Sequence, residues 1–586
     1  MEDYSVFSIL KSFYIKLKEK RKKQVFFLLI IVIASALAET LSLASAFPFL
    51  QAIINSDNLW TNSFVSSGLL SFGFDENDNL ILPISILFGA TAFLASSLKI
   101  YNLWFSGRLA AFIGSDLSNE CFKQNIFQSY EKYFSNKSSN LITNNTLYIS
   151  QCTEILASAA RLFSNVLIGL CLSIYLIILD PLLAIFSIII FLLVYILLGK
   201  KIRRKLIINS KIIDKNSRYQ VQLMQEVAGS FRDIILSNNQ NYFIRIYKNI
   251  DKKIRLKNAE NVFYNVMPRY AIEGLFLILF TLIVYTVSFY ESTFSNIISV
   301  LGTFALGAQK LLPCMQQSYG TWSFIVGSKS SLVNVIKLSN QTLDKSTSLY
   351  NPKPFLFKKS INFINLFYKY PTSNKFTLKD TNVQILKGER VGIIGETGAG
   401  KTTFIDLFMG LIEPSNGFIE VDGVNISERD NFQKKLDWRK SIAHVPQNIF
   451  LNDATIAENI AFGESLDELD MKRVVSSAKK ANIDKFISEK PCNYLTNIGE
   501  NGVQLSGGQR QRIGIARALY KALNIIVLDE ATSALDFSTE TNIMNSIYAL
   551  NKNTTVIVIT HRENSIKKCD KVFEIIDGNI KLRQNF

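Results

Sequence analysis

The sequence predicts a multi-domain membrane protein, in which an all-α six-helix transmembrane domain is followed by an α/β P-loop nucleotide-binding domain. Three observations support this prediction. Of the 586 residues, 48% are hydrophobic, and the mean hydropathy of +0.18 is high for a soluble protein. Six apolar stretches each have about the length that crosses a hydrocarbon core of about 30 Å. A glycine-rich phosphate-binding pattern follows a β-branched run in the second half.

The first apolar stretch is too long for the hydrophobic region of a signal peptide, and no small-residue cleavage site follows it. We therefore expect it to remain as a spanning helix. The six predicted crossings lie near residues 25–50, 80–106, 158–179, 181–199, 270–290 and 296–320.

Charge asymmetry between the connecting segments predicts the orientation in the membrane. Residues 9–23 and 200–218 are densely basic, whereas 56–79, the Asp180-Pro181 turn and 291–296 contain no Lys or Arg. Because basic segments stay in the cytoplasm, both termini are expected on the cytoplasmic side of the membrane.

The overall charge is less specific. The 64 Lys and Arg residues exceed the 48 Asp and Glu residues, which is compatible with anionic lipid, with nucleic acid, or with a base-composition bias toward Ile, Asn and Lys. The six cysteines are widely scattered and there are only two histidines, so neither a zinc site nor a disulfide framework is indicated.

The pattern changes near residue 350 from long apolar stretches to short β-branched runs that alternate with helical segments. We therefore place a six-helix transmembrane domain with cytoplasmic helical extensions at 1–337, a linker at 338–354, and a cassette-like α/β domain at 355–586.

The strand R-V-G-I-I runs into a loop of the form G-x-x-x-x-G-K-[ST], and a helix follows. Backbone amides of such a loop surround a polyphosphate, Lys401 reaches the outer phosphates, and the Thr402 hydroxyl binds Mg²⁺. The alternative is a chance glycine turn. The nucleotide-binding residues expected here are Gly395, Glu396, Thr397, Gly398, Ala399, Gly400, Lys401, Thr402 and Thr403.

Four apolar residues at 525–528 deliver Asp529 and Glu530 to a strand's carboxyl end, where open α/β sheets bind ligands. Asp529 is expected to hold Mg²⁺ through water, and Glu530 to activate the attacking water. A capping or salt-bridge role is the alternative, and the S-A-L-D stretch at 533–536 and His561 at a later strand end argue against it.

Six motifs stand in order over the last third of the chain: the loop at 395–402, Gln447 after Pro446, L-S-G-G-Q at 505–509, V-L-D-E at 527–530, S-A-L-D at 533–536, and His561 after V-I-V-I-T. Together they resemble the ATP-binding-cassette transporter family.

In that family the L-S-G-G-Q stretch of one cassette covers the γ-phosphate of ATP held by the facing cassette. The resemblance therefore implies that each ATP site is completed by a second chain, through Ser506, Gly507, Gly508 and Gln509.

The resemblance implies several further roles. Tyr370 would stack on adenine, and Gln447 and His561 would act in catalysis by sensing hydrolysis. Gln447 would join Thr402 and Asp529 as a metal ligand, and Asp536 would lie at the nucleotide. Segment 497–502 would contact the membrane domain, although Asn501 stands where Arg is common.

One six-helix domain with one cassette is a half-transporter, so the resemblance implies a homodimer with ATP and Mg²⁺ in both sites. The more specific resemblance is to bacterial lipid-linked oligosaccharide flippases, in 38–49, 267–274 and 309–313. A lipopolysaccharide-core or drug-type exporter is the alternative.

Three cations, Lys99, Arg269 and Lys310, lie in or at the ends of different predicted crossings, where an unpaired charge is costly. They are candidates for binding an anionic lipid headgroup in a central cavity. The alternative is that Lys99 and Arg269 reach the inner headgroups and Lys310 pairs with Glu39 or Glu273.

Other classes of protein were weighed. A soluble P-loop ATPase of the chromosome or repair type is excluded by the six apolar stretches, which also leave no role for nucleic acid. A nucleotide-gated channel or a non-transporting regulator is compatible with the sequence, and flux measurements with ATP and a non-hydrolysable analogue separate these from a transporter.

Overall fold

The structure is a computed structural model that describes residues 11, 13–15, 17–54, 80–135, 138–179, 181–287, 294–339, 350–371, 373–428 and 431–583. The chain divides into two compact units. The first unit is Met1–Gln128 with Asn136–Leu343, and the second is Ser129–Ser135 with Asp344–Phe586. The predicted loop at 56–79 and most of the predicted linker lie outside the described residues.

The described part of the first unit is helical. Its elements are α2 (Glu19–Ala44), α3 (Ala46–Ile54), α6 (Ile81–Ile126), α8 (Ser138–Thr143), η1 (Asn144–Tyr148), α9 (Ile149–Leu179), α10 (Pro181–Gly229), α11 (Phe231–Leu236), α12 (Gln240–Val287), α13 (Phe294–Gly327) and α14 (Lys329–Ser339).

Within the described residues, three helical segments are long and apolar enough to cross a membrane: Glu19–Ile53, Ile81–Ile126 and Ser139–Leu179. The other three predicted crossings fall on the helices α10, α12 and α13, and α10 and α12 continue far beyond their apolar stretches. The count of six crossings and the orientation of the termini remain predictions.

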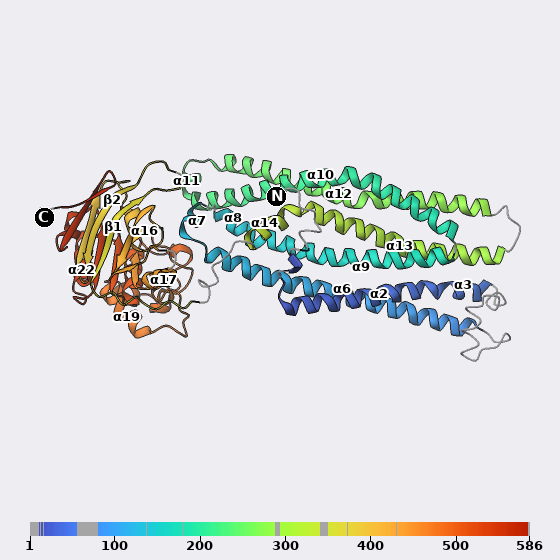
Figure 1. The fold of residues 1–586 in the computed structure, drawn as a ribbon, viewed down its shortest axis with the longest axis horizontal. Helices are drawn as coiled ribbons and strands as arrows, with labels where there is room; N and C mark the ends of the chain where they lie inside the picture. Colours follow the sequence, from blue (N-terminus) through green and yellow to red (C-terminus); the bar gives the residue numbers. More distant parts are fainter. Residues whose placement is uncertain are drawn as a thin grey trace. The chain divides into compact units, whose positions relative to one another are not determined.

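Long helices lie side by side in this unit, with α2 beside α6, α9 beside α13, and α10 beside α12 (Figure 1). Their burial pattern differs from that of a water-soluble bundle, because large apolar side chains are exposed on the outside and polar groups are buried between helices. On α6, Thr91 and Asn102 are buried, and Asn102 donates a hydrogen bond to Ser164 on α9 at 2.8 Å, whereas Phe93 is 76% exposed. Polar groups between helices and apolar side chains outside are what a lipid surrounding favours.

The second unit contains two sheets. An antiparallel sheet has the order β2-β1-β4-β5, and a mainly parallel sheet has the order β10-β9-β3-β8-β7-β6. The strands are β1 (Ser360–Tyr368), β2 (Leu378–Leu386), β3 (Arg390–Gly395), β4 (Asn416–Val421), β5 (Val424–Asn425), β6 (Ile442–Val445), β7 (Ile525–Asp529), β8 (Thr555–Ile559), β9 (Lys571–Ile576) and β10 (Asn579–Leu582).

The helices of this unit, including two 3-10 turns, are α7 (Tyr130–Ser135), α16 (Lys401–Phe408), α17 (Phe432–Lys440), α18 (Ile456–Ile460), α19 (Met471–Lys480), α20 (Asp484–Ser488), η3 (Asn493–Leu495), η4 (Glu500–Gly502), α21 (Gly507–Lys521), α22 (Phe537–Tyr548) and α23 (Glu563–Ile566).

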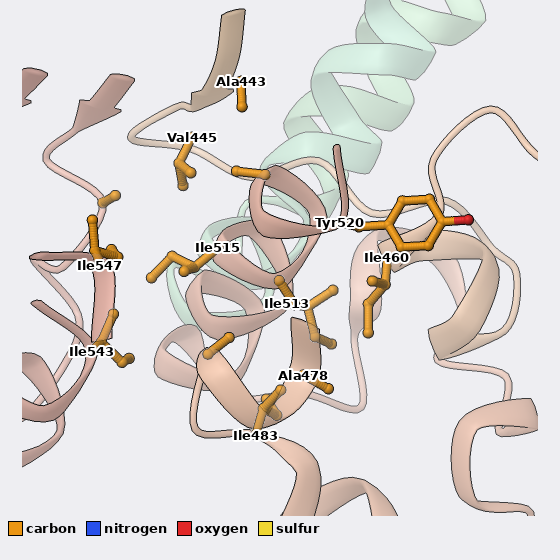
Figure 2. Packing of buried hydrophobic residues seen from close by; sticks show 14 of the residues in the cluster. Ala443, Val445, Ile460, Ala478, Ile483, Ile513, Ile515, Tyr520, Ile543 and Ile547 are labelled. Atoms are coloured by element: carbon orange, nitrogen blue, oxygen red, sulfur yellow. The ribbon is translucent and has the colours of Figure 1, made fainter. Parts of the chain in front are cut away.

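The helix α21 runs through the middle of the larger apolar core of this unit. Its Ile513 and Ile515 are buried together with Val445 of β6, Ile460 of α18 and Ile543 of α22 (Figure 2). Because these side chains fix α21 from several sides, the segment that precedes it is held at a defined place in the unit.

Candidate functional site

The phosphate-binding loop lies between β3 and α16, as the sequence predicts. Gly395, Gly398 and Gly400 have φ values of +153°, +86° and +110°. A Cβ atom at Gly395 would lie 2.6 Å from the carbonyl oxygen of Ile575, so no other residue fits there without a shift of the backbone. The loop therefore has the form of a backbone cradle at the start of α16, which suits a phosphate group.

Lys401, the first residue of α16, is 8% exposed. Its Nζ atom donates hydrogen bonds to the carbonyl oxygens of Gly395 at 2.8 Å and Glu396 at 2.9 Å. Burial lowers the pKa of Lys401, and the nearby carboxylates of Glu530 and Asp529 oppose this effect. The ammonium group is thus held against the loop that would surround the phosphates.

Four parallel strands, β3, β8, β7 and β6, bring the other predicted residues to the same edge of the sheet. Asp529, the last residue of β7, pairs in register with Ile559, the last residue of β8. Glu530 and His561 follow these two strand ends, and Gln447 follows β6. The register alone therefore places the residues close together.

Glu530 is held by two neighbours. Gln447 donates from Nε2 to Oε2 of Glu530 at 2.7 Å, and Nε2 of His561 lies 3.1 Å from Oε1. The backbone of Glu530 has a φ of +46°, which is uncommon for a residue with a side chain and recurs at functional sites. Its carboxylate is 21% exposed, so the group is fixed and still within reach of water.

His561 has two partners for one atom. Its Nε2 lies 3.1 Å from Nζ of Lys401 as well as 3.1 Å from Glu530. A neutral ring with Nε2 unprotonated accepts from Lys401, whereas a protonated Nε2 donates to Glu530. The presence or absence of a proton on Nε2 therefore decides which contact is made.

The predicted metal ligands are oxygen donors, which suits Mg²⁺. Asp529 is half-buried, and burial raises its pKa, with a smaller contribution from Glu530. Thr402 is exposed in the first turn of α16. Among the described residues there is no group of three or more His, Cys, Asp or Glu that could hold a metal ion.

The L-S-G-G-Q stretch forms the start of α21. The Ser506 side chain accepts a hydrogen bond from the Gln509 amide at 3.3 Å, and the Gln509 side chain accepts one from the Ser506 amide at 2.8 Å, which is a capping box. Gln511 ties this helix to Ser533 and Ala534 of the S-A-L-D stretch. Ser506 is exposed, so the helix start faces outward from its own unit.

Asp536 is the N-cap of α22 and accepts from the Thr539 amide at 3.0 Å. Hydrogen bonds from Ser538 and Thr539 hold its pKa well below the usual range. Asp536 therefore has a structural role in the chain in addition to the role that the motif predicts.

Tyr370 lies beside α16, since its hydroxyl is 3.0 Å from Oγ1 of Thr403. Its ring is 39% exposed and meets the buried Tyr368 edge to face at 5.1 Å. Tyr368 also donates to Glu131 of α7 at 3.4 Å, and α7 belongs to this unit although it stands far earlier in the chain. The ring of Tyr370 is thus positioned and partly open, as stacking on a base requires.

The three cations predicted to contact substrate are not equivalent. Lys99 of α6 and Lys310 of α13 both donate to the buried Glu39 of α2, at 3.0 and 2.8 Å. Arg269 lies on α12, 3.6 Å from Glu273 one turn later, and is about half exposed. The structure therefore brings two of the three together around one carboxylate.

Sequence reasoning missed two residues of the nucleotide-binding unit. Arg562 donates from Nη2 to the Ser533 carbonyl at 2.9 Å and from Nη1 to the Leu535 carbonyl at 3.3 Å, so it fixes the S-A-L-D stretch. Asp406 is buried in α16, and burial with the nearby Asp529 raises its pKa to about 6. In the sequence, only their positions could have indicated a role. Arg562 directly follows His561, and Asp406 stands five residues after Lys401.

Comparison with known proteins agrees with this geometry. The profile of the ABC transporter family matches residues 378–533. The β-(1→2)glucan export ATP-binding/permease protein NdvA of Bartonella bacilliformis is 35% identical over 48% of this chain and 47% of its own length. The ATP-dependent lipid A-core flippase of Vibrio vulnificus is 38% identical over 40% of each chain. The chain thus spans about half the length, or less, of the curated relatives it matches.

The fold extends the likeness to nearly the whole chain. A solved structure of a bacterial Atm1-family ABC exporter with ATP bound superposes with a TM-score of 0.76, covering 95% of this chain and 94% of that one. The sequence identity is 20%, so this match concerns the fold alone.

Proposed function

Residues 378–533 are an ABC transporter domain and the described chain has an ABC exporter fold; from this premise we propose that the protein hydrolyses ATP to move a glycolipid across a membrane. The observation that carries the proposal is the position of Glu530, held by Gln447 and His561 beside Lys401 at the carboxyl edge of the sheet. The long apolar helices make the chain a multi-pass membrane protein.

Each residue of this edge has a chemical task. Glu530 takes the proton of the attacking water, since both of its oxygens lie at the sheet edge and are oriented by neighbours. Lys401 would move from the loop carbonyls to the outer phosphates, and Thr402, Gln447 and Asp529 would hold Mg²⁺. When bound, Mg²⁺ neutralises charge on the phosphates.

A second chain completes the site. Ser506 is exposed at the start of α21, where two glycines leave the backbone amides accessible and the helix dipole favours an anion. Such a group of backbone amides on the surface of one chain suits the γ-phosphate of ATP that is held by the second chain. We infer a homodimer with two ATP sites, both of which hydrolyse, since each chain carries Glu530 and the other motifs.

The proposed substrate is a lipid-linked oligosaccharide or a similar glycolipid. The relatives named above are a glucan exporter and a lipid A-core flippase, which both handle carbohydrate. Lys99 and Lys310 share one carboxylate, so this cluster keeps a formal charge of +1. Lys99 is 50% exposed, which leaves it available to an anionic headgroup such as a pyrophosphate. Arg269 is the third proposed contact.

The alternative function is a lipopolysaccharide-core flippase or a drug-type exporter of the same family. The flippase relative favours the first of these. A drug-type exporter has no need of a cationic cluster, so the charge dependence of transport discriminates between the substrates.

The test uses the full chain in proteoliposomes with a headgroup-labelled lipid-linked oligosaccharide and a membrane-impermeant quencher. We expect the label to change sides with ATP and not with a non-hydrolysable analogue. Passage without turnover would indicate a channel, and hydrolysis without passage would refute this substrate.

Variants then test the cationic residues. Lys310→Ala and Arg269→Ala should each lower flipping at least several-fold while basal ATP hydrolysis persists. The control is Lys337→Ala on α14, an exposed lysine, which should leave flipping unchanged. Unchanged flipping by both test variants would refute the cationic contact while leaving ATP-driven transport intact.

A further inference from the structure

A cavity lies in the first unit, in the part of the helices beyond their apolar ends. We call it the extension cavity. It has a volume of about 270 Å³ and is enclosed by η1 with the start of α9, by α10, by α12, by α13 and by the start of α14. Drug-sized ligands occupy about 300–1,000 Å³, so this space suits a smaller molecule.

The lining of the extension cavity is rich in amide and hydroxyl groups. They come from different helices and include Gln151, Ser210, Asn258, Asn261, Asn265 and Ser323. Several already have partners, since Asn261 accepts from Asn209 at 2.9 Å and Ser210 lies 3.0 Å from the Ser330 hydroxyl. The cavity is therefore a built polar site, and the remaining unpaired groups indicate what it accepts.

Ser323 is the clearest of these unpaired groups. It is fully buried, and its Oγ atom has no hydrogen-bond partner within the described part of the chain. On the same helix, Ser318 and Thr321 donate to carbonyl oxygens one turn back, both at 2.7 Å. Ser323 does not follow this common pattern, although it lines the cavity. A buried hydroxyl without a partner destabilises the fold, so a ligand that bonds to it gains affinity.

Asn265 provides a second such group on α12. Its Oδ1 atom is buried and likewise lacks a partner in the described residues. Ser323 can donate or accept, and Asn265 Oδ1 accepts, so hydroxyl groups have the hydrogen-bonding chemistry that both atoms require.

The charge of the lining excludes an anion. Among the described lining residues, Asp214 is the one charged side chain. It is already bound by Tyr148, by Arg218 at 3.3 Å and by Asn334 at 3.4 Å. No lysine or arginine lines this cavity in the described chain, so a phosphate or carboxylate would be left without a counter-charge.

We propose that the extension cavity binds a small, neutral, polyhydroxylated molecule of about monosaccharide size, with Ser323 and Asn265 as its hydrogen-bonding anchors. This site is separate from the cationic cluster of the proposed function and does not depend on it. Its ligand is either a free polyol or the neutral sugar of a membrane glycolipid.

The test measures binding of D-glucose to the full chain in detergent by saturation-transfer NMR. Ser323→Ala removes only the anchoring hydroxyl. Gly327→Ala adds a methyl group to the lining, where the new Cβ meets Asn261 and Leu206 at an ordinary 3.8–3.9 Å, so it narrows the cavity without a clash. We expect both to reduce the transfer signal at least several-fold.

Gly320→Ala is the matched control. It makes the same change on the same helix, at a position outside the lining where a Cβ meets nothing within 4 Å. It should bind D-glucose like the parent. The proposal is overturned if the parent gives no saturable signal, which would mean that the cavity holds water only, or if Ser323→Ala and Gly327→Ala bind as well as the parent does.

A second arm identifies the source of the ligand. Vesicles that contain a neutral glucosyl diacylglycerol are added to the protein with D-glucose. Displacement of D-glucose supports a glycolipid sugar as the ligand, and persistence of the signal supports a free polyol.

Discussion

Nε2 of Gln447 lies 2.7 Å from Oε2 of Glu530 and donates a hydrogen bond to it. The two residues stand at the ends of neighbouring strands, and the bond joins the residue proposed to sense the γ-phosphate to the residue proposed to activate water. His561 lies at the other oxygen of the same carboxylate. We therefore expect ATP hydrolysis to depend on the carboxylate group of Glu530 more than on the shape of its side chain.

Glu530→Gln tests this dependence. The amide keeps the size of the side chain and can still accept from Gln447, but it cannot take a proton from water. We expect ATP hydrolysis to fall by about 10²-fold or more while ATP binding persists, so that the variant accumulates in an ATP-bound dimer. Steady-state hydrolysis and size-exclusion chromatography with ATP measure both effects.

The control is Glu489→Gln, the same change at an exposed carboxylate in the same unit. It should hydrolyse ATP at the parental rate. A Glu530→Gln protein that hydrolyses within a few-fold of the parent would show that another group is the base.

Mixed dimers test whether the second chain completes each site. Gly507→Asp places a negative charge at the start of α21 with little strain, because a Cβ there meets the Ala534 side chain at 3.5 Å. Lys401→Ala disables the phosphate loop. Each variant alone should be inactive. A mixed dimer, however, pairs the intact loop of one chain with the intact helix start of the other.

Random mixing of equal amounts makes half of the dimers mixed, each with one intact site of two. Recovery of about a quarter of parental hydrolysis is therefore expected for a twofold-symmetric dimer with independent sites. No recovery in chains shown by cross-linking to have mixed would mean that each site is complete within one chain.

Much of the nucleotide site could be predicted because it depends on short local patterns. The loop at Gly395–Lys401 and the strand end at Asp529 each follow from a motif in a strand context, and the parallel register then brings them together. Contacts across the fold could not be predicted in this way. The bonds of Arg562 to Ser533 and Leu535 join residues that are 29 and 27 positions apart, and no spacing rule encodes them.

Two other features that the sequence did not predict also have physical reasons. Asn501 has a φ of +52°, a conformation that Asn tolerates better than Arg. This backbone conformation explains why Asn stands at a position where Arg is common. The pairing of Lys99 and Lys310 with Glu39 joins three helices that are separated in sequence. Only the pairing of Lys310 was among the alternatives that the sequence suggested.

The environment of His444 leads us to expect that the folded protein loses stability in acid. His444 lies on β6, its Nε2 has no partner within the described chain, and burial together with Lys521 lowers its pKa to about 4. Between pH 6.5 and about 4 the unfolded state binds a proton that the folded state does not, so stability falls as the pH falls. At pH 4 this effect lowers the free energy of unfolding by up to about 3 kcal/mol, because each unit of the pKa difference corresponds to about 1.4 kcal/mol.

Thermal unfolding of the detergent-solubilised protein between pH 7 and 4 measures this effect. His444→Asn, which does not titrate, should give a shallower dependence of Tm on pH than the parent. The exchange Lys521→Gln should reduce the slope less, since burial is the main cause. Identical slopes for the parent and His444→Asn would assign the acid sensitivity to other groups.

Arg562 gives the last prediction. It donates to the carbonyl oxygens of Ser533 and Leu535, and it pairs with Glu540, whose side chain is only 6% exposed. Arg562→Met keeps an unbranched apolar stem but removes the guanidinium group. We expect ATP hydrolysis to fall about tenfold, because the S-A-L-D stretch loses its two anchors. We also expect a destabilisation of up to about 3–5 kcal/mol, because Glu540 loses its counter-charge.

The double variant Arg562→Met with Glu540→Gln separates the two effects. The amide side chain can still bond to Thr532 and Ser565 but carries no buried charge, so Tm should return toward that of the parent. Hydrolysis should remain low, because the carbonyl anchors are still missing. If hydrolysis recovered together with Tm, Arg562 would act only by balancing the charge of Glu540, and its proposed positioning of Ser533 and Leu535 would be wrong.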